Sequence, residues 1–66
     1  MYILPVDSRE IIKKLEALGF VLVSVKGDHH KFRHPDGRLT IVVHPRKDFP
    51  LGTIKAMERQ SGVKLR

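Results

Sequence analysis

The stretch of sequence that says most about the fold is Lys26-Gly27-Asp28-His29-His30-Lys31-Phe32-Arg33-His34-Pro35-Asp36-Gly37. It predicts a turn, a short strand over His29–Arg33 and a second tight turn, because glycine, proline and aspartate cluster at both of its ends. Side chains alternate across a strand, so the two faces are expected to carry His29, Lys31 and Arg33 on one side and His30, Phe32 and His34 on the other. The face that carries Phe32 should point into the core, which leaves the other face exposed to solvent.

A helix is predicted before this stretch. It should begin at Asp7, whose carboxylate can cap the first amides with Glu10 at the capping-box position, and it should end at Gly19. The apolar stripe of this helix consists of Ile11, Ile12, Leu15 and Leu18. Lys13 and Lys14 fall on its outer side.

Two further strands flank the central stretch. Residues Phe20–Val25 are apolar and β-branched with weak alternation, which favours a central strand of the sheet, and Leu39–Val43 form the third strand. A basic loop bounded by prolines, His44–Pro50, follows. A final helix is predicted over Leu51–Ser61, with Ile54 and Met57 facing inward, Lys55, Glu58 and Arg59 on the solvent side, and Gly62 at its end.

The order of elements is helix, three strands, helix, within a single domain of 66 residues, 1–66. Connections of hairpin length make the sheet antiparallel. We therefore expect a two-layer α+β fold with both helices on one face of a three-stranded sheet, the element order of the double-stranded-RNA-binding domain. A chain of this length buries only a small core, so any active site should be shallow.

The charge balance and the composition narrow the classes of function. Thirteen Lys and Arg against seven Asp and Glu give a net charge of +6, which attracts nucleic acid, an anionic membrane surface or an acidic protein. The membrane is disfavoured because the helices have ordinary amphipathic faces and the apolar N-terminal segment, residues 1–6, is too short for a signal or a span. The chain has no cysteine, which excludes disulfides and thiolate metal sites and is compatible with a reducing cytoplasm.

His29 is the strongest candidate for chemistry. It could be an ordinary surface histidine, but Lys31 and Arg33 share its strand face and could hold a phosphate. Gly27 just before it would let a backbone or a substrate approach closely. Imidazole moves protons near neutral pH, so this group of side chains suits a phosphodiester substrate.

The other histidines and the basic loop have weaker interpretations. His30 is expected to be semi-buried packing, His34 to serve the turn, and a metal site built from His30 and His34 is conceivable. No cysteine or carboxylate cluster completes such a site, so neither a metal nor a cofactor is predicted. Arg46 and Lys47 are either solvated loop residues or a phosphate clamp beside the sheet.

A family resemblance runs through spaced segments from Asp7 to Val63. The chain resembles the HicA toxins of HicA–HicB toxin–antitoxin systems. The segments that carry the resemblance are Ile11-Ile12-Lys13-Lys14-Leu15-Glu16, Gly19-Phe20, Lys26-Gly27-Asp28-His29-His30-Lys31-Phe32, His34-Pro35-Asp36-Gly37-Arg38, His44-Pro45-Arg46-Lys47-Asp48-Phe49-Pro50-Leu51-Gly52-Thr53-Ile54-Lys55 and Gln60-Ser61-Gly62.

The resemblance implies a type II toxin with a fold like the double-stranded-RNA-binding domain. It also implies an mRNA interferase, an endoribonuclease that stops translation by cutting RNA, and a HicB antitoxin that covers its active site. The family's essential histidine follows a Gly-Ser pair and corresponds to His29, but Asp28 replaces the serine here. That carboxylate could repel the phosphate, or it could orient the imidazole and favour its charged form.

The hypothesis from these observations is a metal-independent endoribonuclease. His29 would transfer the proton of a ribose 2′-hydroxyl, while Lys31, Arg33 and either Arg46 or Lys47 would stabilise the charge on the phosphate. His30 is the nearest candidate for a second proton-transfer group. The alternatives are a non-catalytic RNA-binding module of the same fold and a plain interaction domain for an acidic partner.

Overall fold

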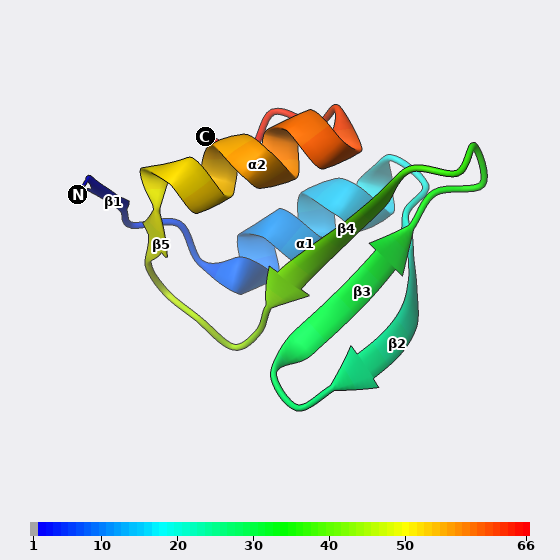
Figure 1. The fold of residues 1–66 in the computed structure, drawn as a ribbon, viewed down its shortest axis with the longest axis horizontal. Coiled ribbons are helices and arrows are strands. Elements are labelled where there is room, and N and C mark those ends of the chain that lie inside the picture. The colour runs from blue at the N-terminus through cyan, green and yellow to red at the C-terminus, as the bar shows by residue number, and fades with distance from the viewer. Residues whose placement is uncertain (1) are drawn as a thin grey trace.

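The computed structural model describes residues 2–66, and its central element is a three-stranded antiparallel sheet (Figure 1). The strands β2 (Val21–Lys26), β3 (His29–Arg33) and β4 (Leu39–Val43) lie in the order β2-β3-β4. The helices α1 (Ser8–Ala17) and α2 (Leu51–Ser61) both contact β4. The predicted α+β fold and its α-β-β-β-α order are therefore confirmed.

Two additional short strands were not expected from the sequence. The strands β1 (Ile3–Leu4) and β5 (Phe49–Pro50) pair antiparallel, so the loop after β4 ends in a strand just before α2. The amide of Leu51 also donates to the carbonyl of Tyr2 at 2.8 Å. Together these bonds fasten the N-terminal segment to the first turn of α2.

Helix α1 begins and ends much as predicted. The Asp7 carboxylate accepts a hydrogen bond from the amide of Arg9 at 2.8 Å. At the other end Gly19 has a φ of +98°, and the amide of Phe20 reaches back to the carbonyl of Leu15 at 3.0 Å, a Schellman arrangement.

The apolar stripe of α1 is shorter than predicted. Ile11 and Leu15 are fully buried, but Leu18 is 55% exposed. The helix has already ended at Ala17, and Phe20 folds back to fill the core beyond the last turn. The prediction that Leu18 belongs to the core was therefore wrong.

Strand β2 is an edge strand, which corrects the expectation of a central one. The central strand is β3, because two tight turns pair it with both neighbours. The helices contact β4 instead, and all six residues of β2 are exposed. The weak alternation of its sequence reflects a bulge, since the register with β3 shifts between Leu22 and Ser24.

The core lies between the sheet and the two helices. The three phenylalanines of the chain are at most 2% exposed, and Val42 of β4 belongs to the same core. Ile54 and Met57 of α2 face this core, as the sequence predicted. No helix in residues 2–66 has the length and apolar character needed to cross a bilayer.

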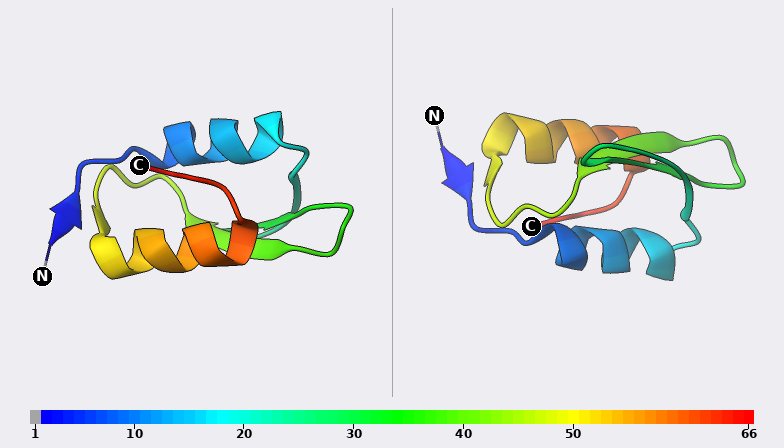
Figure 2. Two further views of the ribbon diagram at one scale, coloured as in Figure 1. Left: turned by 90° about the horizontal axis from the view of Figure 1, so that it is seen from above. Right: turned by 90° about the horizontal axis from the view of Figure 1, so that it is seen from below.

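The segment after α2 completes the core. It runs back between the two helices, as both views in Figure 2 show, and buries Val63 and Leu65. Glu58 accepts a hydrogen bond from the amide of Leu65 at 2.9 Å and pairs with Arg66 at 3.3 Å. Glu58 is therefore an anchor for this tail rather than a free residue on the solvent side of α2.

Candidate functional site

The tight turn between β2 and β3 positions the candidate residues. Gly27 has a φ of +61° and Asp28 a negative φ, the pattern of a two-residue hairpin turn with glycine first. Such a turn places Lys26 directly opposite His29 in the strand register. Directly paired residues point to the same face of a sheet, so Lys26 joins the side chains of His29 and Lys31.

Strand β3 separates the site from the core. Phe32 is 1% exposed and faces the helices, while the His29 side chain on the opposite face is 61% exposed. Lys31 and Arg33 follow at alternate positions on that exposed face. We call it the open face, and it confirms the alternation predicted from the sequence.

Asp28 contacts the ring of His29. Its Oδ1 lies 2.9 Å from Nδ1 of His29, with both side chains about 60% exposed to solvent. Because a carboxylate accepts hydrogen bonds, this contact favours a proton on Nδ1 and leaves Nε2 of the neutral ring with a free lone pair. In this tautomer Nε2 is the nitrogen that can act as a general base.

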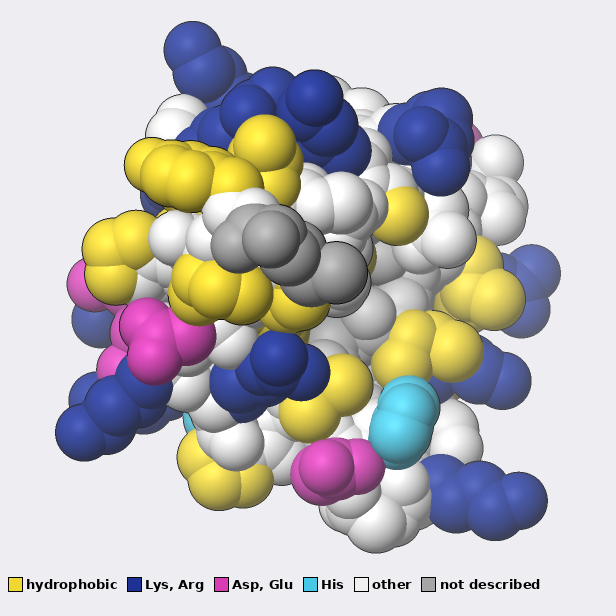
Figure 3. Space-filling view, turned by 60° about the vertical axis from the view of Figure 1, so that its left-hand side comes forward, with side chains coloured by type: hydrophobic (Ala, Val, Ile, Leu, Met, Phe, Trp, Pro, Cys, Tyr) yellow, Lys and Arg dark blue, Asp and Glu magenta, His cyan; other side chains and the backbone are white. Residues whose placement is uncertain are grey.

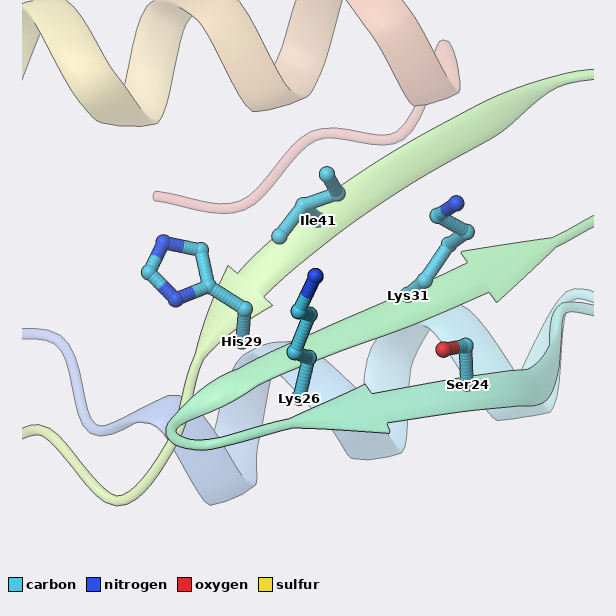
Figure 4. Close-up of a pocket in the computed structure, with 5 residues that line it drawn as sticks. All are labelled: Ser24, Lys26, His29, Lys31 and Ile41. Atoms are coloured by element: carbon cyan, nitrogen blue, oxygen red, sulfur yellow. The ribbon is translucent and has the colours of Figure 1, made fainter.

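The first hollow of the open face surrounds this pair of residues. It has a volume of about 280 Å³ and is lined by Ser24, Lys26, His29, Lys31 and Ile41. Figure 4 shows the five side chains rising from the same side of the sheet, with the ammonium groups of Lys26 and then Lys31 following the imidazole of His29 along it. The hollow is open and shallow, and it suits an extended anionic chain better than an enclosed small molecule.

Lys26 is a site residue that the sequence reasoning missed. It was assigned only to the turn, although a signal was present. A two-residue turn over Gly27 and Asp28 necessarily pairs the residues on either side of it, which are Lys26 and His29.

A second hollow adjoins the first along the open face. Its volume is about 500 Å³, and its walls are Val23, Ser24, Lys31, Arg33, Gly37 and Leu39. Ser24 and Lys31 line both hollows. The structure therefore places His29, Lys31 and Arg33 along two adjoining hollows of the open face.

Arg46 and Lys47 line neither of these hollows. The Arg46 guanidinium lies over the Phe49 ring at 5.1 Å and donates to the carbonyl of Asp48. The loop that carries both residues nevertheless starts beside the hairpin turn, because the amide of His44 donates to the carbonyl of Asp28 at 2.8 Å. It flanks the His29 end of the sheet.

The remaining histidines make contacts within the protein. His30 is half-buried on the core side of β3, where its ring packs edge-on against that of His44 at 5.1 Å. His34 lies at the other end of the strand, with Nε2 donating to the carbonyl of Leu18 at 3.0 Å. The idea that His30 and His34 converge on a metal was therefore wrong, and no group of three or more potential ligand side chains occurs within residues 2–66.

Positive charge is not confined to the sheet. In the view of Figure 3, Lys and Arg side chains surround the visible face on several sides, with exposed apolar side chains between them and few acidic ones. Net charge alone would therefore not locate a binding site. The open face is distinguished by the histidine among its cations.

A family model described as the HicA toxin of bacterial toxin–antitoxin matches residues 8–63. The chain belongs to the HicA toxin family. Membership makes it the toxin of a toxin–antitoxin system and implies an antitoxin partner. The search of curated proteins found no match to this chain.

Proposed function

We propose that this HicA-family toxin is a metal-independent endoribonuclease that cuts mRNA and so blocks translation. The observation that carries the proposal is the contact of 2.9 Å between Asp28 Oδ1 and His29 Nδ1, in a hollow flanked by Lys26 and Lys31. It combines an imidazole that has a carboxylate beside it with two ammonium groups on a solvent-exposed face. A proton acceptor and positive charge are the groups needed for a ribose 2′-hydroxyl to attack the adjacent phosphate of the RNA.

In the proposed reaction, Nε2 of His29 removes the proton of a ribose 2′-hydroxyl. The 2′-oxygen then forms a bond to the adjacent phosphorus, and the bond from phosphorus to the 5′-oxygen breaks. The leaving 5′-oxygen takes a proton from solvent, which the open hollow admits. The products are a 2′,3′-cyclic phosphate and a 5′-hydroxyl.

The cations stabilise the charge that builds up on the phosphate oxygens. Lys26 and Lys31 would act at the cleaved phosphate, while Arg33 and the loop residues Arg46 and Lys47 would hold neighbouring phosphates. A single acid–base group contributes about 10²–10⁴-fold to the rate, so a slow nuclease is expected. His30 is a poor second proton donor, because its ring lies on the core side of β3.

Asp28 acts through the histidine in this mechanism. Of the two roles considered for it, the contact with Nδ1 supports orientation of the imidazole. Repulsion of the phosphate is limited because the carboxylate points to the ring and is partly neutralised whenever the imidazole is protonated.

The antitoxin is proposed to be of the HicB type and to cover the open face with acidic groups. A partner that occludes Lys26, Lys31 and His29 would block both substrate binding and proton transfer. Because the proposed substrate is mRNA, we also propose that the toxin acts in the cytoplasm.

The test is cleavage of a single-stranded RNA by purified protein, with the same sequence in 2′-deoxy form as a control. We expect wild-type protein to release 2′,3′-cyclic phosphate ends from the RNA, and neither the deoxy substrate nor the His29→Ala variant to react. Tight RNA binding with no cleavage by the wild type would instead support the non-catalytic RNA-binding module.

A further inference from the structure

The second hollow of the open face has a composition that phosphate binding alone does not explain. It joins the apolar side chains of Val23 and Leu39, which are 52% and 44% exposed, to the cation Arg33. Val23 owes its place here to the β2 bulge, which inserts it between Leu22 and Ser24 in the strand register. A surface that only followed phosphates would be expected to carry polar residues at these positions.

Arg33 is available for a ligand. The Arg38 and Arg66 guanidinium groups pair with carboxylates, but the Arg33 guanidinium makes no hydrogen bond or ion pair with any residue of the described range, 2–66. A guanidinium is planar and can stack on the face of a nucleobase. Because all three phenylalanines are buried in the core, Arg33 offers a planar group where no phenylalanine can.

We propose that the second hollow binds one unpaired base of single-stranded RNA, seated against Leu39 and Val23 and stacked on the face of the Arg33 guanidinium, whose edge remains free to donate to a neighbouring phosphate. The inference rests on the proposed function, because it assumes that RNA lies along the open face with its cleaved phosphate beside His29. The two hollows share Ser24 and Lys31, so a base in the second hollow belongs to a nucleotide close to that phosphate. Lys31, which lines both hollows, would hold the phosphate that lies between the two hollows.

A base site in the second hollow would also make the protein distinguish single-stranded RNA from duplex RNA. A base can enter the second hollow only if it is unpaired and turned toward the sheet, whereas an RNA duplex presents phosphates and 2′-hydroxyls. The open face would therefore select single-stranded RNA. This differs from the shape-based recognition of duplex RNA by double-stranded-RNA-binding domains, whose element order the chain shares.

The experiment measures binding to the non-cleaving His29→Ala protein, which keeps the second hollow intact. A short single-stranded RNA is compared with a series in which one abasic nucleotide is moved along the sequence. We expect a single abasic position to weaken binding about fivefold to tenfold, in the range of stacking contributions in single-strand binding proteins. A duplex of the same sequence should bind more weakly than the single strand at equal salt.

Matched variants assign the effect to the hollow. Leu39→Thr should remove the difference between intact and abasic RNA and leave affinity for abasic RNA unchanged, and Arg33→Lys should reduce the same difference while keeping the charge. Leu22→Thr is the control, because Leu22 is 42% exposed in the same sheet but pairs with Phe32 and so points to the other face.

Two results would overturn the base site. One is equal binding of intact RNA and of every abasic RNA, and the other is identical behaviour of Leu39→Thr and Leu22→Thr. The proposed nuclease function is tested by a separate measurement, which is RNA cleavage by the wild-type protein. A toxin that binds the base without cutting would refute the nuclease alone, and one that cuts all abasic substrates equally well would refute the base site alone.

Discussion

The hydroxyl of Ser8 lies 2.7 Å from Nδ1 of His44 and joins the first turn of α1 to the end of β4. The same hydroxyl accepts a hydrogen bond from the amide of Arg46 at 3.0 Å, which leaves its own proton available to the imidazole. Ser8 is fully buried, and the amide of Ser8 also donates to the carbonyl of Arg46 at 2.7 Å. One small side chain thus holds the helix, the strand end and the basic loop together.

We predict that Ser8→Ala lowers the free energy of unfolding by about 1–3 kcal/mol, because the ring of His44 and the amide of Arg46 lose a buried partner. Urea denaturation of the purified protein measures the change. Ser24→Ala, an exposed serine in β2, should change stability by less than about 0.5 kcal/mol. Equal effects of the two substitutions would contradict the role of the Ser8 hydroxyl.

His29→Ala should abolish RNA cleavage without unfolding the protein. The side chain is 61% exposed and its face of the strand is turned away from the core, so the free energy of unfolding should move by less than about 0.5 kcal/mol. Cleavage assays and urea denaturation of the same variant test the loss of activity and the unchanged stability. A variant that cuts RNA at the wild-type rate would rule out His29 as the proton acceptor.

Asp28→Asn should slow cleavage by about tenfold to a hundredfold. The amide lacks the negative charge of the carboxylate and can present either its oxygen or its NH2 group to Nδ1, so it favours the required tautomer less; because the ring is exposed, the loss should be smaller than the ~10⁴-fold seen for a buried triad carboxylate. Single-turnover cleavage rates provide the measurement, with Asp48→Asn as the matched control. If Asp28→Asn cleaves faster than the wild type, then the carboxylate repels the substrate instead.

Cleavage should survive EDTA, because the proposed chemistry uses only the imidazole and ammonium groups of the open face. The assay compares rates in chelator, in added magnesium and in added zinc. Activity that disappears in EDTA and returns with either metal would overturn the metal-free mechanism.

RNA affinity should depend on salt through a small set of cations. We expect alanine at Lys31, Arg33, Arg46 or Lys47 to reduce the salt slope of binding by about one unit each, on the His29→Ala background. Lys13 and Lys14 on the outer side of α1 should matter less. Equal losses from the α1 lysines would show that RNA binds elsewhere on the domain.

Stability should fall in acid through the Asp36 and Asp7 carboxylates. The Arg38 amide and guanidinium lower the pKa of Asp36, and hydrogen bonds from Arg9 lower the pKa of Asp7. A lowered pKa in the folded state means that the contribution is complete above the unfolded pKa, near pH ~4, and is lost as pH falls through the folded value. The melting temperature between pH 6 and pH 2 should therefore drop less steeply in an Asp7→Asn, Asp36→Asn double variant than in the wild type.

The sequence was sufficient for the features that depend on local pattern. The period of two in β3 correctly placed Phe32 inside and His29 outside, and the turn residues gave the hairpins. It was insufficient where tertiary contacts decide. The two-residue strands β1 and β5 exist only because they pair, the burial of Leu65 requires the gap between the helices, and Leu18 is exposed because Phe20 takes the core position beyond α1.

The site was predictable in part for the same reason. His29, Lys31 and Arg33 follow from strand alternation alone, whereas Lys26 needs the register across the hairpin and Val23 needs the bulge in β2. The position of Arg46 depends on the Phe49 ring beneath its guanidinium, which no local pattern indicates.

Strand β3 has a consequence for how this toxin can change under selection. Its odd-numbered residues form the open face and its even-numbered residues face the core, so a deletion or insertion of one residue that no bulge absorbed would exchange the two sets in the part of the strand beyond it. Phe32 would move into solvent and cations into the core, and the protein would lose its fold together with its site. A length change in β3 that no bulge absorbs therefore removes the fold and the site together, whereas a point substitution on the open face can inactivate the toxin and leave it folded.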